Sequence, residues 1–127
     1  MKLFCDWYVP QSNLKKKNLF NNKFKIKVKK LINNLKLKNN TLVHRDFHVS
    51  NLMIYNKKLA IIDSQDAVIG NPAYDLASLL DDVRYQTSRS FKDKIYNIYE
   101  HQNKKNFNKK NFLNDFEILS VLRNLKI

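Results

Sequence analysis

Two carboxylates and one amide, all within twenty residues, are the side chains of this sequence best suited to chemistry. A short apolar run leads into His44, Arg45 and Asp46. Asn51 follows five residues after Asp46, and a second apolar run leads into Asp63. Enzymes that transfer phosphoryl groups use such residues to hold metal ions and to orient the attacking hydroxyl. The spacing therefore indicates phosphoryl transfer as the chemistry to examine.

The order His-Arg-Asp, four residues, then Asn is typical of a catalytic loop. In such a loop Asp46 accepts the proton of the hydroxyl and orients it for in-line attack. The amide oxygen of Asn51 suits Mg²⁺, which prefers oxygen ligands, and Asp63 is placed to bridge the metal and the nucleotide phosphates. Each residue alone would more often belong to a turn or a helix cap. Their combination, each in the expected strand or loop context, favours the functional interpretation.

The roles of three further residues, His44, His48 and Asp75, can each be interpreted in two ways. His44 either holds the loop by hydrogen bonding or takes part in the chemistry, and we prefer the first because Asp46 can take the proton. His48 either faces the substrate or packs and caps the loop. Asp75 falls in the first turn of an expected helix, where the helix dipole favours a carboxylate. The same carboxylate could also hold the backbone amides of the catalytic loop.

The elements that position these residues are short. Residues 52–55 and 58–62 read as two strands joined across Asn56 and Lys57, which predicts a β-hairpin. Residues 63–70 look like a loop and contain the only glycine, Gly70. We therefore expect an α+β chain, mostly helical, in which a short hairpin carries the catalytic and metal-binding loops.

Helical spacing of apolar residues appears on both sides of this region. Residues 14–38 alternate in part like a strand, but the length of the pattern favours a helix. Asn71 and Pro72 look like the N-cap and first residue of a helix whose apolar stripe runs to Val83. Two more helices are expected over residues 90–101 and 112–125.

The formal net charge of +13 raises the question of nucleic-acid binding. The basic residues are overwhelmingly Lys, spread along the chain among many Asn, and only four are Arg, the residue that reads bases and clamps phosphates. This pattern favours a compositional bias, so no specific nucleic-acid partner is expected. The single Cys5 cannot form an internal disulfide, and no apolar run is long enough to span a bilayer. We expect a soluble, cytoplasmic protein with no membrane partner.

Two segments resemble a known superfamily. HRDFHVSNLM and IDSQDAVIGNPAYDLASLLDDVR are similar to blocks of the aminoglycoside phosphotransferase and choline kinase superfamily. They look most like the bacterial kinases that phosphorylate the anomeric position of N-acetylmuramate and N-acetylglucosamine. The resemblance implies a protein-kinase-like C-terminal lobe, ATP and Mg²⁺ as cofactors, and the hydroxyl of a small molecule, an amino sugar, as acceptor.

By this resemblance Asp46 is the catalytic base, Asn51 and Asp63 are metal ligands, and Asp75 supports the catalytic loop. We expect His44 to support the loop as well, on the grounds given above. Gln65 and Asp66 match family positions beside the site. Together with Arg45 and His48, they are expected to contact the substrate or to support the residues that do. One departure is Ser64, because relatives usually carry Phe after the metal-binding Asp.

The number of residues between Asp63 and Asp75 also indicates which class of acceptor the site can take. Only eleven residues separate Asp63 from Asp75, which already belongs to the next helix. Protein kinases place a long activation segment there as the platform for a peptide. There is no room for such a platform, so a small molecule is the expected acceptor.

No part of residues 1–40 reads as a nucleotide-binding lobe, and Gly70 follows the catalytic residues rather than preceding them. We therefore expect residues 1–127 to be a partial C-terminal lobe that requires the absent N-terminal lobe for activity. Apolar residues such as Phe4, Trp7, Phe116 and Leu122 would then be exposed, giving marginal stability and self-association. The alternative is a truncated, inactive basic binding module that retains kinase motifs.

Overall fold

The computed structural model describes residues 4–103 and 107–125. Most of this chain is helical, and four short strands lie between the second and third α-helices. The helical elements are η1 (Phe4–Tyr8), α1 (Val9–Gln11), α2 (Lys17–Asn33), η2 (Val49–Asn51), α3 (Tyr74–Leu80), α4 (Arg89–Gln102) and α5 (Lys109–Asn124). The strands are β1 (Thr41–Val43), β2 (Leu52–Tyr55), β3 (Lys58–Ile61) and β4 (Val68–Gly70). The predicted α+β chain, mostly helical with a hairpin, is confirmed.

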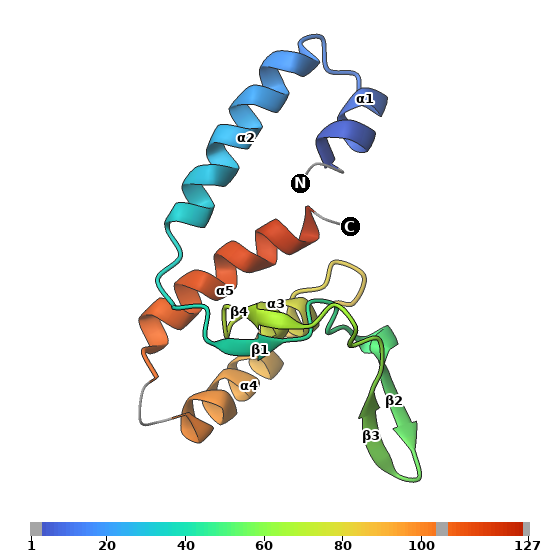
Figure 1. The fold of residues 1–127 in the computed structure, drawn as a ribbon, viewed down its shortest axis with the longest axis vertical. Coiled ribbons are helices and arrows are strands. Elements are labelled where there is room, and N and C mark those ends of the chain that lie inside the picture. The colour runs from blue at the N-terminus through green and yellow to red at the C-terminus, as the bar shows by residue number, and fades with distance from the viewer. Residues whose placement is uncertain (1–3, 104–106, 126–127) are drawn as a thin grey trace.

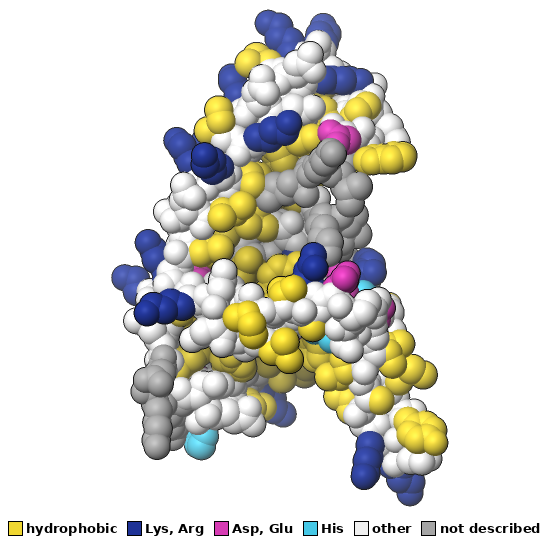
Figure 2. Space-filling model, viewed as in Figure 1, with side chains coloured by type: hydrophobic (Ala, Val, Ile, Leu, Met, Phe, Trp, Pro, Cys, Tyr) yellow, Lys and Arg dark blue, Asp and Glu magenta, His cyan; other side chains and the backbone are white. Residues whose placement is uncertain are grey.

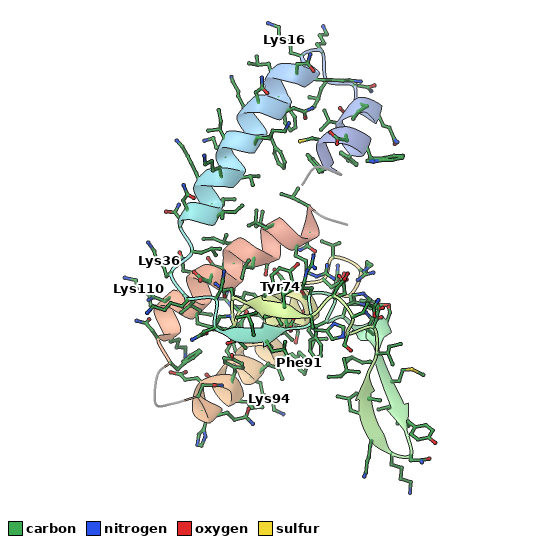
Figure 3. All side chains as sticks on the ribbon, viewed as in Figure 1. Lys16, Lys36, Tyr74, Phe91, Lys94 and Lys110 are labelled. Carbon is green, nitrogen blue, oxygen red and sulfur yellow. The ribbon has the colours of Figure 1, made fainter. Side chains whose placement is uncertain are left out.

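The elements form a body with two projections (Figure 1). Helices α3, α4 and α5 lie together with β1 and β4. Helix α2 rises from this body and carries α1 alongside it, while the hairpin β2–β3 extends in another direction. Figure 3 shows side chains crowded around the labelled Tyr74 and Phe91, within the body, and more widely spaced along the hairpin.

The core lies between α3 and α5. Three apolar residues from α3 and the turn before it pack against three from α5. The first three are Ala73, Ala77 and Leu80, and the others are Phe112, Phe116 and Leu119. Truncating a buried Phe of this kind to Ala typically costs about 3–5 kcal/mol. Asn108 begins α5 by accepting a hydrogen bond from the backbone amide of Asn111 at 3.0 Å, which fixes where the helix starts.

Two antiparallel pairs of strands surround the predicted catalytic residues. The β2–β3 hairpin pairs Leu52 with Ile61, and it turns through Asn56 and Lys57 with φ of 48° and 61°. Two successive positive φ angles give a turn whose twist matches that of the flanking strands. The predicted hairpin is therefore confirmed.

The second pair joins β1 to β4, so the prediction that residues 63–70 form only a loop is wrong for its last three residues. Leu42 lies opposite Ile69, and Val43 opposite Val68. A Cβ on Gly70 would come within 2.6 Å of Val43 Cγ2, so glycine is required here by close approach. This pairing brings the start of the catalytic loop beside the segment that follows Asp63.

The predicted helices are present with shifted ends. Helix α2 is shorter than the expected 14–38, and α5 begins before residue 112 because Asn108 caps it. Helix α3 begins at Tyr74 rather than Pro72, because Asn71 instead caps a preceding turn by accepting a hydrogen bond from Ala73 N at 3.0 Å. Val83 is exposed beyond the end of α3, so it does not belong to the apolar stripe.

The exposed apolar surface differs in part from the expected one. Trp7 is 68% exposed as predicted, but Phe116 is buried in the core because α5 packs on α3. Figure 2 shows hydrophobic side chains gathered over β1 and β4 and along the hairpin. Among the residues the structure describes, no helix has the length and apolar character needed to cross a membrane.

Candidate active site

The carboxylate of Asp75 holds the start of the loop that follows β1. It accepts hydrogen bonds from the backbone amides of His44 at 2.6 Å and Arg45 at 3.1 Å. Asp75 lies in the first turn of α3, so the helix orients its carboxylate towards these two amides. Arg45 has a φ of 74°, a conformation that is costly for a residue with a Cβ. The two hydrogen bonds stabilise that conformation and turn the chain towards Asp46.

The remainder of the loop is organised around the carbonyl of Asp46. That oxygen accepts hydrogen bonds from Asn51 Nδ2 at 2.8 Å and from the backbone amide of His48 at 3.1 Å. The amide nitrogen of Asn51, at the end of η2, is therefore used to close the loop. Its side-chain oxygen is the atom left to bind a cation.

A ring nitrogen of His44 connects this loop to the residue before Asp63. His44 Nε2 lies 2.9 Å from the carbonyl oxygen of Ile62, and the backbone amide of Ile62 donates to the carbonyl of Asn51 at 3.1 Å. Asp63 follows immediately with a φ of 67°. The catalytic and metal-binding loops predicted from the sequence are thus neighbours in space, joined at His44 and Asn51.

The carboxylate of Asp63 has an oxygen that could bind a hard cation, with a bound ligand supplying further oxygens to the same ion. Gln65 Nε2 donates to Asp63 Oδ1 at 2.5 Å, which leaves the second carboxylate oxygen. Within residues 4–103 and 107–125, no group of three or more His, Cys, Asp and Glu side chains could hold a metal ion by itself. Mg²⁺ is commonly held by one or two protein oxygens together with substrate phosphates. Asn51 and Asp63 fit that donor set.

The structure places the other predicted residues beside these two loops. Arg45 Nη1 points towards the backbone carbonyl of Asp66, at 3.4 Å. His48 precedes η2 and makes no side-chain cap hydrogen bond to it, and its Nδ1 is buried without a partner. Capping is therefore not what its side chain does in this conformation. Ser64 is exposed.

The pattern of the phosphotransferase enzyme family matches residues 3–107. The chain belongs to this family. The match contains both loops, the hairpin between them and Asp75, so it covers every site residue predicted from the sequence. Family membership supports phosphotransferase chemistry at the level of the family and does not favour the alternative of a basic binding module.

One curated member is similar over a shorter stretch. The N-acetylmuramate/N-acetylglucosamine kinase of Neisseria meningitidis serogroup B (strain ATCC BAA-335 / MC58) is 45% identical over 49 residues. These residues are 39% of this phosphotransferase chain and 15% of the relative. The matched stretch therefore covers a small part of that kinase.

Sequence reasoning missed three charged residues beside the catalytic loop of this phosphotransferase. Arg84 donates hydrogen bonds to the Asp82 carboxylate from Nε at 2.9 Å and from Nη2 at 2.5 Å. Arg123, in the last turn of α5, brings Nη2 to 3.9 Å from the same carboxylate. Asp82 and Arg123 are both buried. The hydrogen bond from Arg84 is the largest cause that lowers the pKa of Asp82, to about 2.

The two arginines of this cluster contribute to a lowered pKa of His48. Burial is the main cause that lowers the pKa of His48, and the charges of Arg84 and Arg123 lower it further. The charges of Asp82 and Asp46 act in the opposite direction. The sequence signals for this cluster were an Asp two positions before an Arg in the block that resembles the family, and the segment LRNLKI, which contains Arg123 and also looks like a family segment.

A separate cavity of about 360 Å³ is lined by Thr41, Pro72, Tyr99 and Phe112 among others. It shares no residue with the two loops, so we do not assign the chemistry to it.

Proposed function

We propose that this chain supplies the acceptor-binding and metal-binding lobe of an ATP-dependent phosphotransferase. The acceptor is a hydroxyl of a small molecule, an amino sugar of the N-acetylmuramate or N-acetylglucosamine type. Family membership supports the reaction class, and the similarity to the meningococcal kinase supports the acceptor class. The short connection between Asp63 and Asp75 supports a small acceptor over a peptide.

The observation that carries the proposal is the contact between the two loops through His44. The His44 ring is bonded to the carbonyl of Ile62, and the His44 amide is bonded to Asp75. This arrangement keeps the loop of Asp46 and the loop of Asp63 in one place without a long connecting segment. Positioning of this kind is the main contribution that a protein makes to phosphoryl transfer.

In the proposed reaction Asp46 accepts the proton of the acceptor hydroxyl while the hydroxyl oxygen forms a bond to the γ-phosphorus of ATP. The bond between that phosphorus and the bridging oxygen of ADP breaks, and ADP leaves with the electron pair. Asn51 keeps the Asp46 backbone in place through its hydrogen bond to the Asp46 carbonyl. His44 and Asp75 are positioning residues.

Asn51 Oδ1 and the carboxylate of Asp63 would hold Mg²⁺, with Gln65 orienting the carboxylate. When bound, the cation neutralises charge on the β- and γ-phosphates. With one glycine, this sequence does not supply the glycine-rich loop that covers the phosphates in kinases. We therefore propose that a nucleotide-binding lobe outside this sequence completes the site.

The test is ATP-dependent transfer to amino sugars by this chain fused to, or mixed with, a nucleotide-binding lobe of the same family. Asp46→Asn and Asp63→Ala should each lower kcat by at least about 100-fold, since each removes a group that acts on the reacting atoms. Asp93→Asn, an exposed change on α4, is the matched control and should leave kcat within about twofold. Near-normal turnover in either site variant would show that the assigned roles are wrong.

A further inference from the structure

The cluster of Asp82, Arg84 and Arg123 is not used by the chemistry proposed above. Its centre is the Asp82 carboxylate, whose side chain is 1% exposed. Arg84 engages this carboxylate through its backbone amide and two side-chain nitrogens. Such a fork of parallel hydrogen bonds fixes the plane of a guanidinium as well as its position.

The cluster has more positive than negative charge. Two guanidinium groups share one carboxylate, and the 3.9 Å separation of Arg123 from Asp82 is longer than a hydrogen bond. Arg123 is 6% exposed, and its Nε is buried without a partner. Because a buried cation needs compensating negative charge, this arrangement favours the arrival of an anion nearby.

Arg84 is the member of the cluster that a ligand can reach. Its side chain is 41% exposed, whereas those of Asp82 and Arg123 are almost fully covered. Asp82 occupies Nε and Nη2 of Arg84, which leaves the Nη1 edge of the guanidinium. A guanidinium already oriented by a buried carboxylate loses little freedom when it binds a second oxyanion.

The cluster also lies close to the catalytic loop. The hydrogen bond to Asp82 is the main cause that raises the pKa of Arg84, and the charge of Asp46 contributes in the same direction. The charges of Arg84, Arg123 and Asp82 also act on the pKa of His48, two residues after Asp46. The charge of Arg84 therefore acts on the loop that an acceptor hydroxyl would approach.

We propose that Arg84, oriented by Asp82 and Arg123, binds a carboxylate of the acceptor and makes this site selective for acidic amino sugars. An acidic acceptor would otherwise be repelled by the negative charge of Asp46, and the excess positive charge of the cluster offsets that repulsion. N-Acetylmuramate and N-acetylglucosamine differ by a lactyl ether that ends in a carboxylate, so they are suitable probes. This inference rests on the proposed function and adds a specificity-determining residue to it.

The experiment is titration of the full chain with each sugar, without ATP, by calorimetry. The wild-type chain should bind N-acetylmuramate about 10- to 100-fold more tightly than N-acetylglucosamine, as expected for one charge-assisted pair. Arg84→Gln should remove this preference. Arg84→Lys should retain part of it, because Lys keeps the charge and loses the fork. Arg89→Gln, which removes the same group from an exposed position on α4, is the matched control and should keep the full preference.

Three results would overturn the inference: equal binding of the two sugars by the wild-type chain, no measurable binding of N-acetylmuramate, or an unchanged preference in Arg84→Gln. Thermal melts of each variant identify any loss of folding, and Arg84→Lys keeps the test valid if Arg84→Gln unfolds. In a second set of titrations, inorganic phosphate and ATP replace the sugars. Arg84-dependent binding of either one, without a sugar preference, would assign the anion to the nucleotide instead.

A negative result for the role of Arg84 can be distinguished from a failure of the proposed phosphotransferase function. Transfer to the neutral N-acetylglucosamine by the completed enzyme tests phosphoryl transfer without requiring a carboxylate.

Discussion

The side-chain amide of Asn71 donates a 2.7 Å hydrogen bond to the carboxylate of Asp115, 44 positions further along the chain. The same fully buried carboxylate accepts backbone hydrogen bonds from Lys36 at 2.8 Å and Leu37 at 2.9 Å. Asn114 donates a further bond at 2.9 Å. Asp115 therefore joins three segments: the approach to β1, the turn before α3, and α5. These segments position His44 and Asp75.

Replacing Asp115 should destabilise the whole chain. In Asp115→Asn one carboxylate oxygen becomes an NH₂ group that faces hydrogen-bond donors in a buried site. We expect the free energy of unfolding to fall by about 2–4 kcal/mol. Urea denaturation followed by circular dichroism measures this change. Asp93→Asn, exposed on α4, should stay within about 0.5 kcal/mol of the wild-type chain. Similar midpoints for the two variants would contradict the role given to Asp115.

Stability should fall in acid because of Asp82 and Asp115. The hydrogen bond from Arg84 is the main cause that lowers the pKa of Asp82 to about 2, from the value of 3.8 expected when unfolded. Burial by itself would raise the pKa of Asp115, but hydrogen bonds from Asn71 and its backbone partners outweigh burial and lower that pKa. Both carboxyls bind protons less readily when folded. The stabilising contribution of Asp82 is therefore present above about pH 4 and is lost as the pH falls towards about 2, and that of Asp115 is lost in the same direction.

For Asp82 this contribution is about 1–2 kcal/mol, because the exposed part of Arg84 weakens the pairing through solvent screening. Thermal melts at pH 7, 4 and 2.5 measure it. Asp82→Asn should show a shallower loss of stability between pH 4 and 2.5 than the wild-type chain. Parallel pH profiles would mean that Asp82 carries no such linkage.

Asp75 should control the local stability of the catalytic loop. In Asp75→Asn, one of the two acceptors for the amides of His44 and Arg45 is lost, and the positive φ of Arg45 loses support. We expect the His44 and Arg45 amides to exchange with solvent deuterium about 10- to 100-fold faster. Exchange followed by NMR gives the rates residue by residue. Asp93→Asn, exposed on α4, is the control. Protection that survives in Asp75→Asn would argue against this role.

The outer face of the β1–β4 pair should drive self-association of the isolated chain. Leu42 and Ile69 lie opposite one another and are 69% and 62% exposed. Together with the exposed residues of the hairpin they form an apolar surface of the kind that promotes association. Sedimentation velocity should show species larger than a monomer at tens of micromolar. The double variant Leu42→Glu, Ile69→Lys places opposite charges across the strands and should restore the monomer. A monomeric wild-type chain at that concentration would refute the prediction.

Local patterns were sufficient for the hairpin, the three long helices and the spacing of the site residues. A two-residue turn, apolar residues at helical spacing and the interval between Asp46 and Asn51 are all properties of neighbouring residues. The same patterns placed Asp75 in the first turn of a helix, but its hydrogen bonds to two amides 30 and 31 positions away depend on packing.

Only the tertiary structure decided the contacts between segments that are far apart in the sequence. The β1–β4 pairing, the hydrogen bonds of Asp115 to two other segments and the approach of Arg123 to Asp82 have no local signature, because each joins residues that are at least 25 positions apart in the sequence. The sequence by itself determined which side chains could carry out phosphoryl transfer and in what order they occur. The contacts of α3 with the loop after β1 determined how those side chains are held, and the packing of α5 brought Arg123 to Asp82.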